Sequence, residues 1–137
     1  MEALEAHGTG TALGDPIEVG AATHALDDVE VASASLKANL GHLEAVAGGA
    51  GTTSLLAVPL STTCIAPNAQ LRQLNPHLNS LIREARFRLP VRESLPRLSP
   101  LRLADGRVSS FGATGTIAHA LFATEWALPR ISQVIST

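Results

Sequence analysis

The chain has 137 residues, enough for one domain with a hydrophobic core, and 45% of them are hydrophobic. Its net charge of −2 gives no electrostatic argument for a nucleic-acid partner, and its single cysteine excludes an internal disulfide framework. No apolar run approaches the roughly 20 residues that span a bilayer, and the first residues lack the basic region of a signal peptide. We therefore expect a soluble α/β protein without a membrane partner, located in the cytoplasm or in a plastid or other organelle.

The charges are distributed unevenly along the chain. The first 44 residues contain eight acidic residues and one lysine, whereas residues 83–107 contain seven arginines and three acidic residues. A solvated surface explains the basic stretch, and so does a docking surface for an acidic partner. The sequence leaves both interpretations open.

The first segment predicts a short strand over residues 2–7, which delivers His7 to a turn with glycines at 8, 10 and 14. A helix over 16–26 is expected to follow this turn. Asp15 is the predicted N-cap of that helix, and Glu18, three residues later, completes a predicted capping box. An ionisable side chain at a strand end above a glycine-rich turn is a common feature of active sites.

A second strand is predicted over residues 29–40, and it is followed by a helix over 43–60. The helix contains Gly48, Gly49 and Gly51, and each glycine costs about 1 kcal/mol relative to alanine in a helix interior. We therefore expect another segment to pack very closely against this turn, although a helix broken at 48–49 is an alternative.

The remaining segments are less regular. They comprise an irregular stretch over 61–79, a helix leading into a strand over 80–88, a proline-rich loop over 90–100, a turn at 105–106 and a final strand over 117–126. This pattern predicts one domain over residues 1–126 and a tail over 127–137.

Three kinds of chemistry are disfavoured by the residues. The glycine spacing of the first turn resembles a dinucleotide fingerprint, but Asp15 would place a carboxylate where a pyrophosphate must bind. His7, His42 and Glu44 lack the short spacing of a zinc site. Cys64 has no glycine-rich elbow or helix N-terminus beside it, so it is expected to be a small buried hydrophobic residue rather than a nucleophile.

Three longer segments together resemble the β-ketoacyl synthases, and among them the ketosynthase domains of modular polyketide synthases. These segments are Glu5 to Glu18 (EAHGTGTALGDPIE), Lys37 to Ala45 (KANLGHLEA) and Ser109 to His119 (SSFGATGTIAH). The resemblance covers residues 2–126, with the motifs in the family's order.

The resemblance implies an α/β fold, the C-terminal half of a thiolase-like fold with a mixed sheet and covering helices. It implies decarboxylative condensation of malonyl-type and acyl thioesters on an acyl carrier protein. His7 and His42 would be the decarboxylating histidines, and Lys37 would orient the site, in a pair with Glu44. The substrate-binding and oxyanion loop residues would be Thr9, Thr11, Phe111, Gly112, Ala113, Gly115 and Thr116. No metal and no cofactor is implied, apart from the phosphopantetheine carried by the carrier protein.

The family's nucleophilic cysteine lies before the first histidine motif, at which this chain begins. The sequence therefore indicates half a ketosynthase, whose N-terminal half is on another chain or missing, and predicts no chain elongation by this polypeptide alone. Homodimers are typical of the family, but half a domain gives little basis for one. One alternative is a non-catalytic module that binds a ketosynthase or, through the arginines of 83–107, an acidic carrier protein. Another alternative is a non-functional gene fragment.

Overall fold

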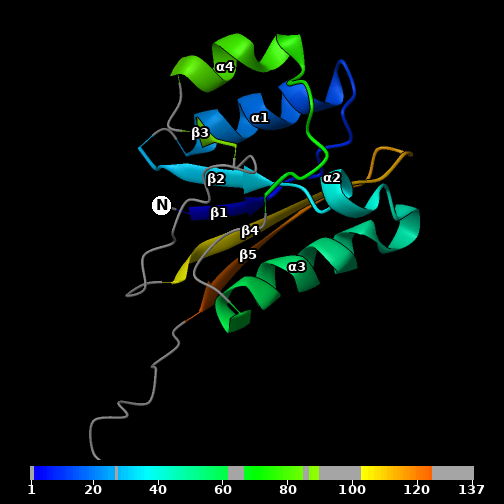
Figure 1. Ribbon diagram of the computed structural model, residues 1–137, viewed down its shortest axis with the longest axis vertical. Helices are drawn as coiled ribbons and strands as arrows, with labels where there is room; N and C mark the ends of the chain where they lie inside the picture. Colours follow the sequence, from blue (N-terminus) through cyan, green and yellow to red (C-terminus); the bar gives the residue numbers. More distant parts are fainter. Residues whose placement is uncertain (1, 27, 62–66, 85–86, 90–102, 125–137) are drawn as a thin grey trace, which may run out of the picture.

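The protein is described by a computed structural model, shown as a ribbon in Figure 1. The described residues are 2–26, 28–61, 67–84, 87–89 and 103–124. Cys64, the whole predicted loop over 90–100 and the predicted tail over 127–137 lie outside these residues.

A five-stranded sheet forms the centre of the fold, with the strand order β3-β2-β1-β4-β5. The strands are β1 (Glu2–Glu5), β2 (Val31–Ala34), β3 (Phe87–Arg88), β4 (Leu103–Phe111) and β5 (Ile117–Thr124). The pairs β3–β2, β2–β1 and β1–β4 are parallel, whereas β5 returns antiparallel to β4 as a hairpin. The predicted mixed sheet of an α/β fold is confirmed.

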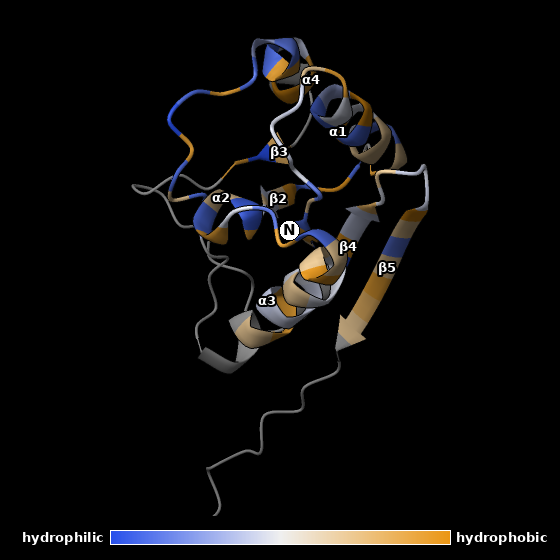
Figure 2. Ribbon diagram, turned by 90° about the vertical axis from the view of Figure 1, so that its right-hand side faces the viewer, coloured by the Kyte–Doolittle hydropathy of each residue, from blue (hydrophilic) through white to orange (hydrophobic). Residues whose placement is uncertain are grey.

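The helices lie on both faces of the sheet (Figure 1). One face carries α1 (Gly14–Ala25), the 3₁₀ turn η2 (Pro76–Leu78) and α4 (Asn79–Glu84), and the other carries α3 (Ala47–Ser61). Two short turns, α2 (Lys37–Leu40) and η1 (Glu44–Val46), connect β2 to α3. No charged residue occurs in α3, and the helix is pale to orange along its length in Figure 2.

The core has two parts because neighbouring strand residues point to opposite faces of the sheet. Ala3 of β1 packs towards α3, in a cluster with Leu55 and Val108. Leu4, the next residue, packs on the other face with Val19 of α1. Small side chains on the first face allow α3 to approach the sheet closely, and this places the start of α3 beside the ends of the central strands.

The second predicted strand is much shorter in the structure, and its C-terminal part was predicted wrongly. β2 ends at Ala34, and Lys37–Leu40 forms one helical turn. The reason is that the N–H groups beyond β2 bind side chains: Ser35 N–H donates to Asn68 at 2.9 Å and Leu36 N–H donates to Glu5 at 2.6 Å. The chain therefore leaves the sheet before residue 40.

The predicted capping box is also wrong. The helix begins at Gly14 with Leu13 at the N-cap position and no side-chain capping bond, and Asp15 lies inside the first turn, where it accepts from the N–H of Gly10 at 3.1 Å. The N–H of Gly14 donates instead to the hydroxyl of Thr11 at 3.0 Å. Glu18 does not reach back to the cap because its carboxylate binds the backbone at the end of β1.

Two smaller predictions are corrected as well. Asp105 and Gly106 do not form a turn but lie inside β4, where a side chain at position 106 would come within 2.7 Å of Leu55. The helix predicted over 43–60 is divided into η1 and α3, and α3 is continuous through Gly48 and Gly49.

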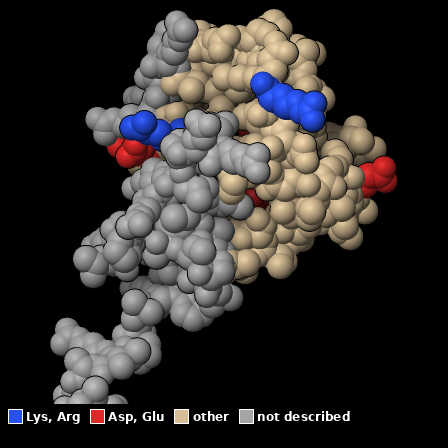
Figure 3. Space-filling view, in the orientation of Figure 1, with Lys and Arg blue, Asp and Glu red and all other residues tan. Residues whose placement is uncertain are grey.

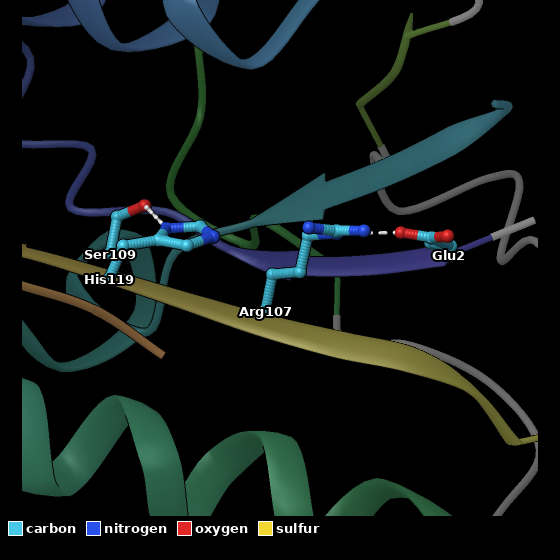
Figure 4. Close-up of polar contacts among 4 residues, drawn as sticks. All are labelled: Glu2, Arg107, Ser109 and His119. Atoms are coloured by element: carbon cyan, nitrogen blue, oxygen red, sulfur yellow. Dashed lines mark hydrogen bonds and ion pairs between the residues drawn. The ribbon is translucent and has the colours of Figure 1, made fainter. Parts of the chain in front are cut away.

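Two arginines of the basic stretch pair with acidic residues of the N-terminal part. Arg107 of β4 binds Glu2 of β1 at 2.6 Å, in the partly buried pair drawn in Figure 4, and Arg88 binds Glu30 at 2.8 Å on the surface. On the face shown in Figure 3, charged side chains of the described residues are few and scattered. The uneven charge of the sequence is thus partly neutralised within the fold.

Candidate active site

The candidate site lies where β1, β2 and β4 end. His7 follows β1 and is buried, whereas His42 follows α2 and is exposed. Their ring centroids are 5.7 Å apart, with the rings at 85° to each other. The ring of Phe111, the last residue of β4, lies 5.1 Å from that of His7. Three segments that are far apart in the sequence therefore meet around His7.

Both imidazoles use Nδ1 as a hydrogen-bond acceptor. The N–H of Phe111 donates to Nδ1 of His7 at 3.3 Å, and the N–H of Glu44 donates to Nδ1 of His42 at 2.8 Å. An Nδ1 that accepts carries no proton, so a neutral ring must carry its proton on Nε2. Each ring thus has an Nε2–H that can donate to a ligand.

The surroundings of His7 favour its neutral form. Burial lowers the pKa of His7 below 6.5, the charges of Lys37 and His42 lower it further, and Asp15 has the opposite effect. A neutral imidazole can donate from Nε2 without adding a positive charge to the site.

Lys37 lies on the first turn of α2, and burial lowers its pKa, while Glu5 and Glu18 raise it. Its electrostatic partners are therefore these two carboxylates. The ion pair with Glu44 expected from the sequence is not among the ion pairs formed by the described residues. Glu44 instead is exposed, with a left-handed φ of 49°, and its N–H fixes His42.

The ends of β1 and β2 approach each other closely, and this approach requires a glycine after β1. Gly8 has a φ of +47°, and a Cβ there would lie 2.8 Å from Cβ of Ser35 at the end of β2. The two strand ends that carry the site residues can be this close only without a side chain at position 8.

The other expected binding residues lie in two places. Thr9 and Thr11 belong to the glycine-rich turn, where the hydroxyl of Thr11 already accepts from Gly14. The hairpin loop between β4 and β5 is closed by a bond from Gly112 N–H to the carbonyl of Thr116 at 2.7 Å and by one from Gly115 N–H to that of Gly112 at 3.0 Å. This loop, which includes Ala113, is exposed, and Phe111 at its base reaches His7.

Sequence reasoning missed the role of two buried carboxylates. Glu5 and Glu18 are 6% and 5% exposed. Burial raises the pKa of Glu5 to about 7 and also raises that of Glu18. A signal was present in the sequence, since both acidic residues stand among apolar and small residues.

A cavity of about 490 Å³ adjoins the turn on the α1 side of the sheet. Gly8, Asp15 and Asn75 are part of its lining, whereas His7, Lys37 and His42 are not. The catalytic candidates therefore face a different side of the strand ends.

The described part of the chain contains neither a candidate metal site nor a membrane-spanning helix. Its side chains include no group of three or more His, Cys, Asp or Glu residues that could hold a metal ion. None of its helices combines the length and apolar character needed to cross a bilayer.

Comparison with known proteins matches residues 1–72 to the family described as "Beta-ketoacyl synthase, C-terminal domain". A phenolphthiocerol/phthiocerol polyketide synthase of Mycobacterium tuberculosis H37Rv is 43% identical over 125 residues, which are 86% of this chain and 8% of that protein. Erythronolide synthase EryA2 of Saccharopolyspora erythraea is 37% identical over 124 residues, 88% of this chain and 3% of that protein.

Solved structures agree with these sequence matches. The oxazolomycin ketosynthase domain OzmH KS7 of Streptomyces albus JA3453 superposes with a TM-score of 0.78 at 34% identity, over 92% of this chain and 22% of that one. Ketosynthase twelve of the bacillaene synthase of Bacillus amyloliquefaciens gives a TM-score of 0.73 at 35% identity, over 90% of this chain and 22% of that one. The chain thus spans less than a quarter of each of these relatives.

Proposed function

Because the chain belongs to the β-ketoacyl synthase family, of whose C-terminal domain it forms part, we propose that its site supports the decarboxylation of a malonyl-type thioester. This step would supply the carbon nucleophile for condensation with an acyl thioester. When the carboxylate leaves as CO₂, the electron pair of the broken C–C bond becomes an enolate, and negative charge develops on the thioester oxygen.

The observation that carries this proposal is that His7 and His42 are hydrogen-bonded in the same way. Both rings have Nδ1 occupied by a backbone N–H, and their centroids are only 5.7 Å apart. Two Nε2–H groups are therefore available to donate to a developing enolate oxygen. Fixed donors aimed at developing charge are among the strongest contributions to catalysis.

We further propose roles for the groups around the histidines. Lys37 would orient the site, and its positive charge favours the neutral His7 ring by lowering the pKa of that ring. Thr9, Thr11 and the loop residues Gly112, Ala113, Gly115 and Thr116 would contact the thioester and the phosphopantetheine arm of an acyl carrier protein. The cysteine that accepts the acyl chain would come from the N-terminal part of a ketosynthase, and the complete reaction would require that part.

Carbon dioxide release tests this proposal. The chain, combined with a separately produced N-terminal ketosynthase half, is incubated with a malonyl thioester labelled at the free carboxylate, and labelled CO₂ is measured. His7→Ala and His42→Ala are each expected to reduce the rate roughly 10²-fold to 10³-fold. His24→Ala, an exposed histidine at the end of α1, serves as the matched control.

Equal CO₂ release by the unmodified chain, His7→Ala and His42→Ala would contradict the proposal. Salt-sensitive binding of a carrier protein that persists in both variants, without any CO₂ release, would favour the non-catalytic module instead. Of the arginines in 83–107 whose side chains the structure describes, Arg88 and Arg107 are already engaged with Glu30 and Glu2.

A further inference from the structure

The backbone at the ends of β1 and β2 leaves several N–H groups without a partner in the sheet. β1 ends at Glu5 and β2 ends at Ala34, so the N–H groups of His7, Gly8 and Leu36 lie beyond the strand ladder. Buried N–H groups need acceptors, since an unpaired donor away from water costs free energy comparable to a lost hydrogen bond.

Glu18 satisfies the end of β1. Its Oε1 accepts from the N–H of His7 at 2.7 Å, and its Oε2 accepts from the N–H of Gly8 at 2.9 Å. Both carboxylate oxygens are thus used on consecutive residues, and the side chain is only 5% exposed. This contact fixes the backbone from which the His7 ring projects, and it comes from α1, on the opposite face of the sheet from α3.

Glu5 satisfies the end of β2. Its Oε1 accepts from the N–H of Leu36 at 2.6 Å, directly before Lys37 on the first turn of α2. Gly51 of α3 makes room for this side chain, because a Cβ at position 51 would lie 3.0 Å from Cγ of Glu5.

We propose that Glu5 and Glu18 are positioning residues, which fix the ends of β1 and β2 and so hold Lys37 and the His7 ring in place. The proposal concerns the same site as the proposed function and gives that site its supporting contacts. Its test involves no thioester, so the two can fail separately.

Conservative substitutions separate the role of Glu18 at the end of β1 from that of Glu5 at the end of β2. Glu18→Gln retains one acceptor oxygen but turns an NH₂ group towards a backbone N–H, so one of the two bonds at His7 and Gly8 is lost. Glu5→Gln retains an acceptor for Leu36 but removes the negative charge that acts on Lys37.

Glu2→Gln is the matched control. It changes a partly buried carboxylate of the same strand, but at the far end of β1, where Glu2 pairs with Arg107 (Figure 4).

The experiment is NMR on the full chain labelled with ¹⁵N-histidine and ¹³C-lysine. Lys37 is the only lysine of the sequence, so its side chain gives one unambiguous signal. Glu18→Gln is expected to move the ring-nitrogen signals of His7 towards a mixture of tautomers. Glu5→Gln is expected to shift the titration of Lys37 to lower pH. Glu2→Gln is expected to lower the unfolding temperature while leaving both signals in place.

Unchanged His7 and Lys37 signals in the folded Glu18→Gln and Glu5→Gln proteins, or equal changes in Glu2→Gln, overturn the proposal. If a variant does not fold, amide hydrogen exchange in the unmodified chain tests whether the two carboxylates bind these backbone N–H groups. The N–H groups of His7, Gly8 and Leu36 are then expected to exchange at least about tenfold more slowly than that of Thr9, and equally fast exchange overturns the proposal.

Discussion

The N–H of Phe111 donates to Nδ1 of His7 at 3.3 Å, between residues 104 positions apart in the sequence. This bond joins the end of β4 to the end of β1 and places the proton of a neutral His7 on Nε2. Its length is slightly above the usual range for a hydrogen bond. The rings of Phe111 and His7 also pack with their centroids 5.1 Å apart, and this contact helps to hold His7 in place.

The first prediction concerns the titration of His7. Burial and the charge of Lys37 lower its pKa below 6.5, so the unfolded chain binds a proton more readily than the folded chain. The contribution of His7 to the free energy of unfolding is fully present above pH 6.5. It is lost as the pH falls from 6.5 towards the folded-state pKa of His7. NMR titration of the His7 ring measures the folded value directly, and a midpoint at or above 6.5 would contradict the prediction.

Glu5 gives a pH dependence of the opposite sign. Burial raises its pKa from 4.5 to about 7, so the folded chain holds a proton that the unfolded chain releases, and stability falls as the pH rises from about 4.5 to about 7. The shift corresponds to about 3 kcal/mol, at about 1.4 kcal/mol per pKa unit.

Urea unfolding of the unmodified chain and of Glu5→Gln, at pH 5 and pH 8, measures this contribution. The variant is expected to lose less stability between the two pH values than the unmodified chain. The comparison removes the titration of Glu5 together with the effect of its charge on Lys37 and Glu18, whereas the other titrating groups are present in both proteins. An identical pH dependence in the two proteins would show that Glu5 titrates normally.

Replacement of glycine by alanine in α3 is expected to have opposite effects on stability at positions 49 and 51. Gly49 has open space around it, so Gly49→Ala is expected to stabilise the fold by up to about 1 kcal/mol through helix propensity. Gly51→Ala would place a methyl group 3.0 Å from Cγ of the buried Glu5, and it is expected to destabilise the fold or to displace Glu5. The unfolding temperatures of the two variants check this, and the prediction fails if both rise equally.

The two ion pairs are expected to differ strongly in their contributions. The side chains of Arg107 and Glu2 are 17% and 16% exposed, so Arg107→Ala leaves a partly desolvated carboxylate and is expected to cost about 3 kcal/mol. Those of Arg88 and Glu30 are 69% and 41% exposed, and Arg88→Ala is expected to cost less than about 1 kcal/mol. Free energies of unfolding from denaturant titration distinguish the two cases, and equal losses would contradict this ranking.

The sequence alone determined the kind of fold and the family, and it predicted where in the chain the candidate site lies. Apolar strand segments, each followed by a polar or glycine-rich turn, indicated an α/β protein with chemistry at the strand ends. The long motifs around His7, His42 and Phe111 indicated the family. These features are local, because a motif or a hydrophobic pattern is written in consecutive residues.

Only the tertiary structure decided which groups act on the site residues. Glu18 has the spacing of a capping partner, yet it binds the backbone of His7 and Gly8, and Lys37 interacts with Glu5 and Glu18 rather than with Glu44. Local spacing could not reveal these contacts because they depend on how α1 and α2 lie against the end of β1. The sheet places β1 between β2 and β4, so residues about 30 and 100 positions away satisfy the polar groups at its end.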